Sequence, residues 1–321
     1  MSRKTWTRLL WVGLSLFISV TLFQHAALCA NVMQLSMGTG TAGGIFSDVG
    51  IPLATCINAA WREVNITAEI TEGSVENLRL MNQKKMQISV ISPQIAYFAR
   101  KGIANFKDSP IDVSVIVRLL PNTNIWVALE GSGIKTFADM RGKKVGVGPA
   151  SGGLGTYAQL QLAGNGMDYK KDVKPYFMSV GEMTEALKDK AIDAAILTVG
   201  AAHIAAATHK IRVISWGENE LNGYVTKYPY CARYILPPNT FKGANYPVLT
   251  ADNGVQLICR TDADEGLVYK LAKTTTENLK CIGDAYAPAK EMTREWVASE
   301  LGNPFHPGAI KYFKETGLWK K

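Results

Sequence analysis

The sequence predicts an α/β fold of two lobes that are joined by hinge strands. Short apolar runs typical of strands alternate with segments of helical periodicity, as in a parallel-rich sheet covered by helices. The order strand, glycine-rich loop, helix occurs twice, once from residue 32 and again from residue 144. The chain has 321 residues, enough for two lobes of ordinary domain size even without its first 30 residues. We expect lobe 1 to comprise residues 31–126 and 258–321, and lobe 2 residues 127–257.

The first 30 residues have the layout of a secretory signal peptide. A basic start at Arg3, Lys4 and Arg8 precedes an apolar run from Leu9 to Phe23, and small residues follow up to Ala30. The apolar run is shorter than the roughly 20 residues of a membrane span, which disfavours the alternative of an N-terminal membrane anchor. We therefore expect cleavage after Ala30 and a periplasmic mature protein.

The elements of lobe 1 follow from periodicity and from helix boundary signals. Pro93 suits the first turn of a helix and Gly102 its end, and Ser74 is an expected N-cap. The expected strands are 32–37, 66–71, 88–91, 113–120 and 125–129, and the expected helices begin at residues 43, 74 and 93.

Lobe 2 shows the same alternation up to residue 216. Ser179 and Glu182 form a capping box, and Thr136 with Asp139 resembles another. The expected strands are 144–147, 193–199 and 211–216, with helices over 157–162 and from Ser179 to Lys190. We expect the chain to return to lobe 1 through a strand at 255–259, which a helix from Glu265 to Lys280 follows after an Asp262 cap. Residues 217–254 are rich in Gly, Pro, Asn and Tyr, so we expect them to be mostly irregular.

Composition limits the class of function. The apolar fraction is 47%, typical of a globular protein, and the net charge of +8 falls to +5 (32 Lys and Arg minus 27 Asp and Glu) without the signal segment. The chain has no run of Lys and Arg with interleaved aromatic residues, so we expect no nucleic-acid partner.

Four cysteines follow the signal segment, at positions 56, 231, 259 and 281. In an oxidising compartment they can form a disulfide in any of several pairings, or they can be buried free thiols; the sequence leaves both open. Because the chain has no Cys or His cluster at metal-ligand spacing, we expect no metal site.

Two glycine-rich loops dominate the candidate site. Gly38, Gly40 and Gly43 match the G-x-G-x-x-G fingerprint of dinucleotide binding, and Glu72 stands near the position of a ribose-binding acid. The second loop covers residues 148–156. Each loop opens a helix whose N-terminus favours an anion, so two loops facing one cleft would suit a small anionic ligand.

The sequence contains no recognisable catalytic set. It lacks G-x-S-x-G, and no Ser/His/Asp grouping is readable. We therefore expect a binding protein with no catalytic residues and no cofactor, rather than an enzyme. An exported enzyme with a dinucleotide in the first loop is the least favoured alternative, and a sensory binding module for a membrane receptor is another.

The chain resembles the TAXI family, the extracytoplasmic solute receptors of one class of TRAP transporters. The resemblance rests on MGTGTAGG (residues 37–44), TEGSVENLRL (71–80), SGIKTFADMRGKKVGVG (132–148) and HPGAIKYFKETG (306–317), in the same order as in the family. It implies a type II-like periplasmic-binding-protein fold and a small organic acid, such as glutamate or 2-oxoglutarate, that is delivered to an ion-gradient-driven permease. The family usually has Thr-Tyr-Tyr-Pro where this chain has Ile45-Phe46-Ser47-Asp48.

The resemblance and the polar helix starts together define the candidate ligand site. Arg118 and Arg233 are candidates for a carboxylate clamp, because arginine can bind a carboxylate through two parallel hydrogen bonds; the alternative for each is an ion pair within the protein. The other expected ligand-binding residues are Gly40, Thr41, Gly43, Gly44, Phe46, Ser74, Asn77, Ser92, Gln94, Ser151, Gly155, Thr156, Gly200 and Tyr230.

Overall fold

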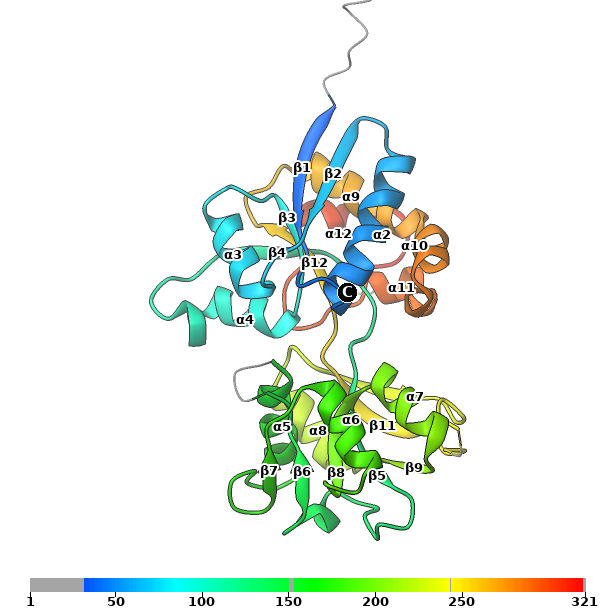
Figure 1. The fold of residues 1–321 in the computed structure, drawn as a ribbon. Helices are drawn as coiled ribbons and strands as arrows, with labels where there is room; N and C mark the ends of the chain where they lie inside the picture. The colour runs from blue at the N-terminus through cyan, green and yellow to red at the C-terminus, as the bar shows by residue number, and fades with distance from the viewer. Residues whose placement is uncertain (1–31, 150–152, 243, 320–321) are drawn as a thin grey trace, which may run out of the picture.

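A computed structural model describes residues 32–149, 153–242 and 244–319. The expected signal segment and Ser151 lie outside the described residues. In the described part of the chain the strands form two five-stranded sheets and one two-stranded sheet. Figure 1 shows one large sheet in each of two lobes, which lie one above the other. The predicted α/β fold of two lobes is therefore confirmed.

Lobe 1 contains the sheet of order β2-β1-β3-β12-β4. Its strands are β1 (Met33–Gly38), β2 (Val64–Glu69), β3 (Ile88–Ile91), β4 (Val113–Arg118) and β12 (Gln256–Arg260). The first three are parallel, whereas β12 runs antiparallel to both β3 and β4, so the sheet is mixed. The helices are α2 (Ile45–Ala60), α3 (Ser74–Asn82), α4 (Pro93–Lys101), α9 (Glu265–Glu277), α10 (Leu279–Ala285), α11 (Arg294–Val297) and α12 (Pro307–Glu315), with 3₁₀ turns η1 (Ala104–Phe106) and η3 (Ala287–Glu291).

Lobe 2 contains the sheet of order β7-β6-β8-β5-β9. Its strands are β5 (Asn124–Leu129), β6 (Lys144–Gly146), β7 (Lys174–Tyr176), β8 (Ala194–Thr198) and β9 (Ile211–Ile214), and the separate pair is β10 (Ala232–Leu236) with β11 (Val248–Asp252). The helices are α5 (Gly153–Gly164), α6 (Val180–Lys188), α7 (Val199–Thr208) and α8 (Glu218–Lys227), with the 3₁₀ turn η2 (Ala138–Met140). Strand β5 is antiparallel to both β8 and β9.

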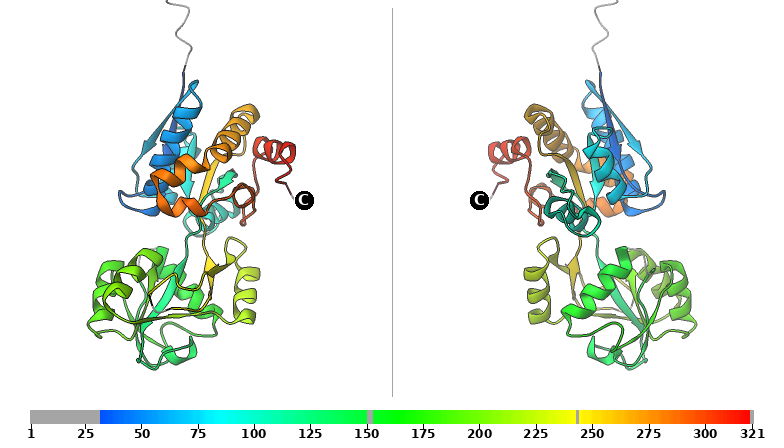
Figure 2. Two further views of the ribbon diagram at one scale, coloured as in Figure 1. Left: turned by 90° about the vertical axis from the view of Figure 1, so that its right-hand side faces the viewer. Right: turned by 90° about the vertical axis from the view of Figure 1, so that its left-hand side faces the viewer.

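Two short segments connect the sheets of the two lobes. Residues 119–123 lead from β4 to β5, and residues 253–255 lead back from β11 to β12 (Figure 2). The segments bond to each other, since Leu119 N donates to Val255 O at 2.7 Å and Asn253 N donates to Asn122 O at 3.2 Å. The expected boundaries at 126/127 and 257/258 fall inside β5 and β12, and the division of the chain into independent units stays a prediction.

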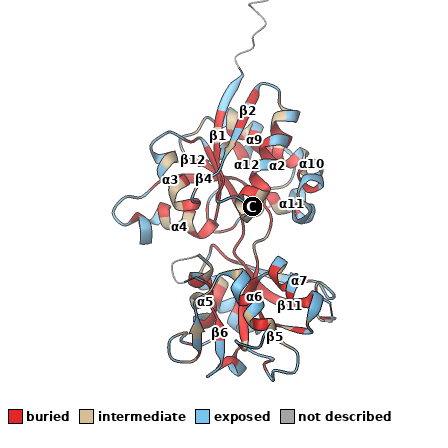
Figure 3. Cartoon of the chain, viewed as in Figure 1, coloured by how far each residue is buried: buried red, intermediate tan, exposed pale blue. Residues whose placement is uncertain are grey.

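Apolar side chains fill each lobe separately. One cluster of buried residues lies around the lobe 1 sheet and two lie around the lobe 2 sheet. Most residues of β3 and β4 are apolar and fully buried, such as Val90 and Val117, which explains why both segments have the composition of strands buried on both faces. Figure 3 shows the same pattern, with buried strands inside and exposed helix faces outside.

The four cysteines divide into one disulfide and two thiols. Cys56 of α2 and Cys281 of α10 form the disulfide, which links the first helix of lobe 1 to its C-terminal part. Cys231 and Cys259 are free and buried. The sequence left this choice open.

Several local expectations are wrong. Residues 217–254 are not mostly irregular, because they form α8, β10 and β11. Asp264, not Asp262, caps α9 by accepting from Leu267 N, and Asp262 pairs with Arg260. Asp139 accepts from the backbone N–H groups of Lys135 and Thr136, and only the 3₁₀ turn η2 follows.

Other boundary signals hold. The capping box at Ser179 and Glu182 is present at the start of α6, and α4 begins at Pro93 and ends at Gly102 in the left-handed conformation. Within the described residues no helix is both long enough and apolar enough to span a membrane.

Candidate functional site

The first glycine-rich loop forms a tight turn before α2. Gly44 N donates to Thr41 O at 3.0 Å, and Gly43 has φ 73°, a left-handed conformation that favours glycine. Thr41 and Gly43 are exposed. Gly44 is the N-cap of α2 and has no side chain with which to cap it. The turn therefore presents an uncapped helix N-terminus at the protein surface.

Residues beneath this loop hold it in place. Asn77 Nδ2 donates to Thr39 O at 2.8 Å, and Thr39 Oγ1 donates to Glu69 O at 2.7 Å. A Cβ added at Gly40 would lie 3.4 Å from atoms of Phe46, so the half-buried Phe46 side chain packs directly on the glycine. Asn77 is fully buried, and its hydrogen bond to Thr39 supports the loop.

The starts of α3 and α4 are bonded to each other. Ser92, the N-cap of α4, donates its backbone N–H to Ser74 Oγ at 3.1 Å. Gly73, with φ 114°, is the N-cap of α3, so Ser74 is its first residue and not the expected cap. Ser92 Oγ lies 3.0 Å from the hydroxyl of Tyr157, which belongs to α5 of lobe 2. This hydrogen bond joins the two lobes.

Lobe 2 contributes the starts of α5 and α7. Gly148 has φ 82°, and a Cβ at Gly155 would lie 2.4 Å from Pro149 O, so the loop closes tightly on the first turn of α5. Thr156 is exposed beside it. Gly200 is exposed in the first turn of α7, where the Thr198 side chain accepts from Ala201 N at 3.2 Å.

We expect Gly155→Ala to lower the melting temperature, whereas Gly200→Ala leaves it unchanged or raises it. The added methyl at residue 155 overlaps a backbone oxygen, and forced overpacking of this kind costs about 1–3 kcal/mol. At Gly200 no atom lies within 4 Å of the added Cβ, and alanine is the better helix former. Differential scanning calorimetry of both variants checks this prediction. Equal melting temperatures of the two variants would show that the loop around Gly155 accommodates the methyl group without loss of stability.

Tyr230 lies at the contact between the lobes. Its ring centroid is 5.4 Å from that of Tyr97 and 5.7 Å from that of Phe98, both on α4 of lobe 1. Only 4% of Tyr230 is exposed, and burial raises the pKa of its hydroxyl, which stays protonated. Its contacts join the two lobes: the rings pack on each other, and the Gln94 side chain of α4 interacts with the Tyr230 hydroxyl.

Arg118 pairs with a carboxylate of the protein itself. Its guanidinium donates to Asp252 at 2.6 Å and to Ser299 at 3.0 Å, and it stacks on Trp296 at 3.8 Å from the ring centroid. Only 5% of Arg118 is exposed, and its positive charge is balanced by Asp252 inside the protein. Because Arg118 ends β4 and Asp252 ends β11, the ion pair lies at the connection between the lobes.

Arg233 is also committed elsewhere. It lies on β10 and donates to Glu218 and to Asn222 of α8, each at 2.6 Å. These bonds hold the guanidinium on the surface of lobe 2. Both arginines therefore form ion pairs within the protein, the alternative that the sequence left open, and their part in binding a ligand carboxylate stays a prediction.

A protein-family model matches residues 37–317, which is most of the chain. The chain belongs to the NMT1-like family. Two solved structures share the fold of this family member. The periplasmic aliphatic sulphonate binding protein SsuA of Escherichia coli has 14% identity and a TM-score of 0.52, with 90% of this chain and 94% of that chain covered. A putative sulfonate-binding SsuA of Methylobacillus flagellatus KT has 10% identity and a TM-score of 0.54, with 91% and 89% covered.

These similarities show that the NMT1-like chain has the two-lobed fold of periplasmic binding proteins. Both solved structures are described as binding proteins, not as enzymes. The more specific TAXI and TRAP assignment stays a prediction.

Sequence reasoning missed two polar residues of the NMT1-like chain that lie beside the predicted ligand-binding residues. Tyr157 reaches from α5 to Ser92 of lobe 1, and Thr198 caps α7. Thr198 stands two residues before the expected ligand position Gly200, at the end of a buried strand, so a threonine N-cap was a readable signal. Tyr157 offered none, since a tyrosine inside a helix pattern equally indicates core.

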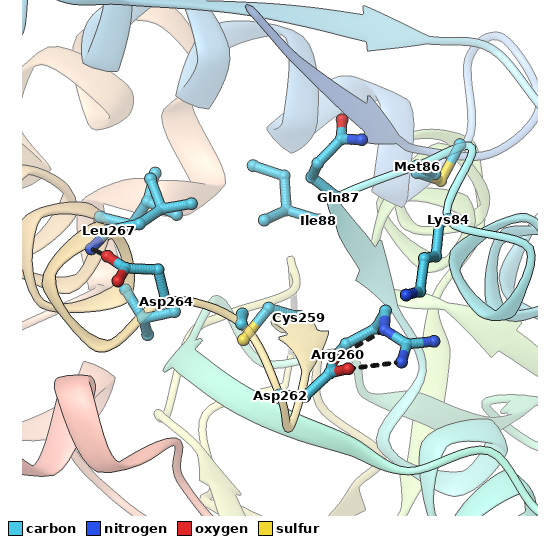
Figure 4. A pocket seen from close by; sticks show the side chains of 12 residues that line it. Lys84, Met86, Gln87, Ile88, Cys259, Arg260, Asp262, Asp264 and Leu267 are labelled. Atoms are coloured by element: carbon cyan, nitrogen blue, oxygen red, sulfur yellow. Dashed lines mark hydrogen bonds and ion pairs between the residues drawn. The ribbon is translucent and has the colours of Figure 1, made fainter. Parts of the chain in front are cut away.

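A separate pocket lies on lobe 1 of the NMT1-like protein. It has a volume of about 290 Å³ and lies between the segment before β3 and the start of α9 (Figure 4). Met86, Ile88 and Leu271 give it an apolar lining, and Arg260 at its rim is paired with Asp262 at 2.7 Å. None of the predicted ligand-binding residues lines this pocket. Within the described residues, no group of three or more His, Cys, Asp or Glu side chains could hold a metal ion.

Proposed function

We propose that the protein is an extracytoplasmic solute-binding receptor that captures a small organic acid between its two lobes. The observation that carries the proposal is the set of helix starts with polar residues that both lobes contribute. Helices α2, α3 and α4 begin directly after strands β1, β2 and β3, and α5 and α7 begin after β6 and β8. Ligands of open α/β sheets bind at these carboxyl ends of strands.

Helix N-termini favour an anion as the ligand. The helices α2, α5 and α7 have 16, 12 and 10 residues, and each N-terminus carries about half a unit of positive charge. The backbone N–H groups and hydroxyls of these turns can donate to carboxylate oxygens. Since Arg118 and Arg233 are bound to acidic partners within the protein, the charge of an acid would be balanced mainly by these dipoles.

Closure of the lobes would convert binding into a signal for a membrane partner. The lobes are joined by two short segments, so a rotation at residues 119–123 and 253–255 would bring the helix starts together. The resemblance to TAXI proteins supports a TRAP-type permease as the partner that reads the closed form. One of the two solved structures above is described as part of a sulfonate ABC transporter. Reconstitution of the protein with a TRAP-type permease and with an ABC-type permease would test which class is its partner.

The disulfide supports a location outside the cytoplasm. Cys56 and Cys281 are bonded, and such bonds persist in oxidising compartments. The layout of residues 1–30 supports export by the same route. Together they favour the periplasm as the place of function.

We expect at least one small carboxylic acid to raise the melting temperature of the purified mature protein. A ligand that is present at about 100 times its Kd stabilises the folded state by about 2.7 kcal/mol. The panel contains acidic amino acids, 2-oxo acids, dicarboxylates, alkanesulfonates and reduced nicotinamide dinucleotide, and native mass spectrometry identifies any molecule that co-purifies.

The panel separates the alternatives. Saturable binding of a carboxylate supports the proposal, and a response to sulfonates alone would replace the organic acid by a sulfonate. Micromolar binding of the dinucleotide would support the enzyme alternative, and no response to any acid at millimolar concentration would contradict the proposal.

A further inference from the structure

The hydrogen bonds at the starts of α3 and α4 leave the hydroxyl proton of Ser74 unused. Ser74 Oγ accepts from Ser92 N, so this bond does not use the Ser74 hydroxyl proton. Ser92 is the N-cap of α4, but its side chain makes no capping bond, so its oxygen can accept from elsewhere. The bonding partner of Ser92 Oγ is the hydroxyl of Tyr157, at 3.0 Å.

The direction of the bond between Ser92 and Tyr157 determines what Ser92 can offer. If Tyr157 donates, Ser92 Oγ is the acceptor and its own proton is free for a third group. If Ser92 donates, that proton is consumed within the protein. A phenol is the stronger acid of the two hydroxyls, which favours Tyr157 as the donor. Burial raises the pKa of Tyr157, so its proton is present at every physiological pH.

We propose that Tyr157 is a positioning residue of the ligand site: its hydroxyl donates across the lobes to Ser92, and so aims the Ser74 and Ser92 hydroxyl protons at one anionic oxygen group of the ligand. This inference rests on the proposed function, since it assigns roles within the same site. It names the recognised group as a deprotonated carboxylate or a similar oxyanion, which has enough lone pairs for two donors.

A third donor lies beside this pair. Gln94 is two residues after Ser92 in the first turn of α4, and only 3% of it is exposed. Its Nε2 makes no hydrogen bond of standard geometry among the described residues, although the side chain lies within reach of the Tyr230 hydroxyl. A buried donor without a partner is costly, so a site that supplies an acceptor to it gains from doing so. A ligand oxyanion beside Ser92 would be such an acceptor.

The small exposure of the two serines agrees with a place at the floor of a site. Ser74 is 8% exposed and Ser92 is 7% exposed, so a ligand group would have to come close to the backbone there. A carboxamide keeps only one of the two carboxylate oxygens, and its N–H₂ group would face a hydroxyl donor where the second oxygen had been. The arrangement therefore selects an acid over its amide.

The experiment compares Tyr157→Phe with the wild-type protein by isothermal titration. The probes are the carboxylic acid that gives the largest thermal shift in the panel and the amide of that acid. We expect Tyr157→Phe to bind the acid roughly tenfold more weakly and to lose most of its preference for acid over amide, because Ser92 then has no donor to accept from. Tyr224→Phe is the matched control, because Tyr224 is a buried lobe 2 tyrosine whose hydroxyl faces Cys231 within the lobe.

A cycle with Ser92 separates positioning from a merely structural role. Ser92→Ala should weaken acid binding, Ser92→Thr should retain it, and Tyr157→Phe should have little further effect in the Ser92→Ala background. If circular dichroism shows that Tyr157→Phe does not fold, Ser92→Ala and Ser92→Thr are compared in its place. The inference then requires that Ser92→Thr keep the preference for acid over amide and that Ser92→Ala lose it. Wild-type preference in Tyr157→Phe would overturn the inference while the proposed function stands. If the wild-type protein binds no acid, the proposed function fails, and the inference fails with it.

Discussion

Asp252→Asn will lower the free energy of unfolding by about 3–5 kcal/mol, the cost of breaking a buried ion pair by removal of one charge. Asp252 is fully buried, and its carboxylate accepts from Arg118 at 2.6 Å. The same carboxylate accepts from Asn122 N at 2.7 Å and from Gly254 N at 2.8 Å, one from each connecting segment. Asparagine has nearly the same shape but leaves the Arg118 guanidinium buried without a counter-charge.

Equilibrium denaturation in urea measures this effect. Glu218→Gln is the control, since it removes a charge from the more exposed Glu218–Arg233 pair and should change stability by less than about 1 kcal/mol. A double variant, Arg118→Met with Asp252→Leu, removes both charges and should recover part of the loss. If Asp252→Asn is as stable as Glu218→Gln, the pair does not brace the connection between the lobes.

Removal of the disulfide has the second largest expected effect. Cys56→Ala with Cys281→Ala should lower the free energy of unfolding by about 2–5 kcal/mol, because the bridge closes a long loop in the unfolded chain. The two cysteines are 225 positions apart, so in the unfolded protein the bridge closes more than half of the 321-residue chain into one loop. Cys56 is buried on α2, so loss of the bridge also loosens α10 from that helix.

Reductant provides the matched comparison for the disulfide. Dithiothreitol should lower the melting temperature of the wild-type protein to that of the double cysteine variant, and it should leave the variant unchanged. Cys231 and Cys259 are free and buried in both proteins and so do not contribute to the difference. A variant that melts at the wild-type temperature would contradict a stabilising role for the bridge.

Local signals predicted the elements of lobe 1 well because each had a physical cause in the sequence. Ile88 to Ile91 is wholly buried and apolar apart from Ser89, and Pro93 fits the first turn of the following helix. The prediction that residues 217–254 are mostly irregular was wrong for the opposite reason. The helix α8 contains Gly223 and two asparagines, and only Leu221 and Tyr224 of it are buried, so its periodicity is weak. Strand β10 is stabilised by pairing with β11, a long-range contact that no local pattern encodes.

The glycine-rich turns of the candidate site were predictable from the sequence, whereas the ion-pair partners of its two arginines were not. The glycine-rich turns have sequence signatures because φ values such as that of Gly43 exclude most other residues. Arg118 pairs with Asp252, which is distant from it in the sequence. Arg233 pairs with Glu218, which belongs to a helix that the sequence did not predict. The role of Tyr157 depends on how the lobes meet, which periodicity does not record.

The position of β12 inside the lobe 1 sheet determines the order in which the lobes can be completed during synthesis. Strand β4 pairs with β12 and not with β3, so its inner edge stays open until residues 256–260 have emerged. All strands of the lobe 2 sheet precede that point in the chain. Lobe 2 can thus assemble while lobe 1 still carries an unpaired strand edge, which is the stage most open to aggregation. A chain truncated before residue 256 would keep one complete sheet and one that cannot close.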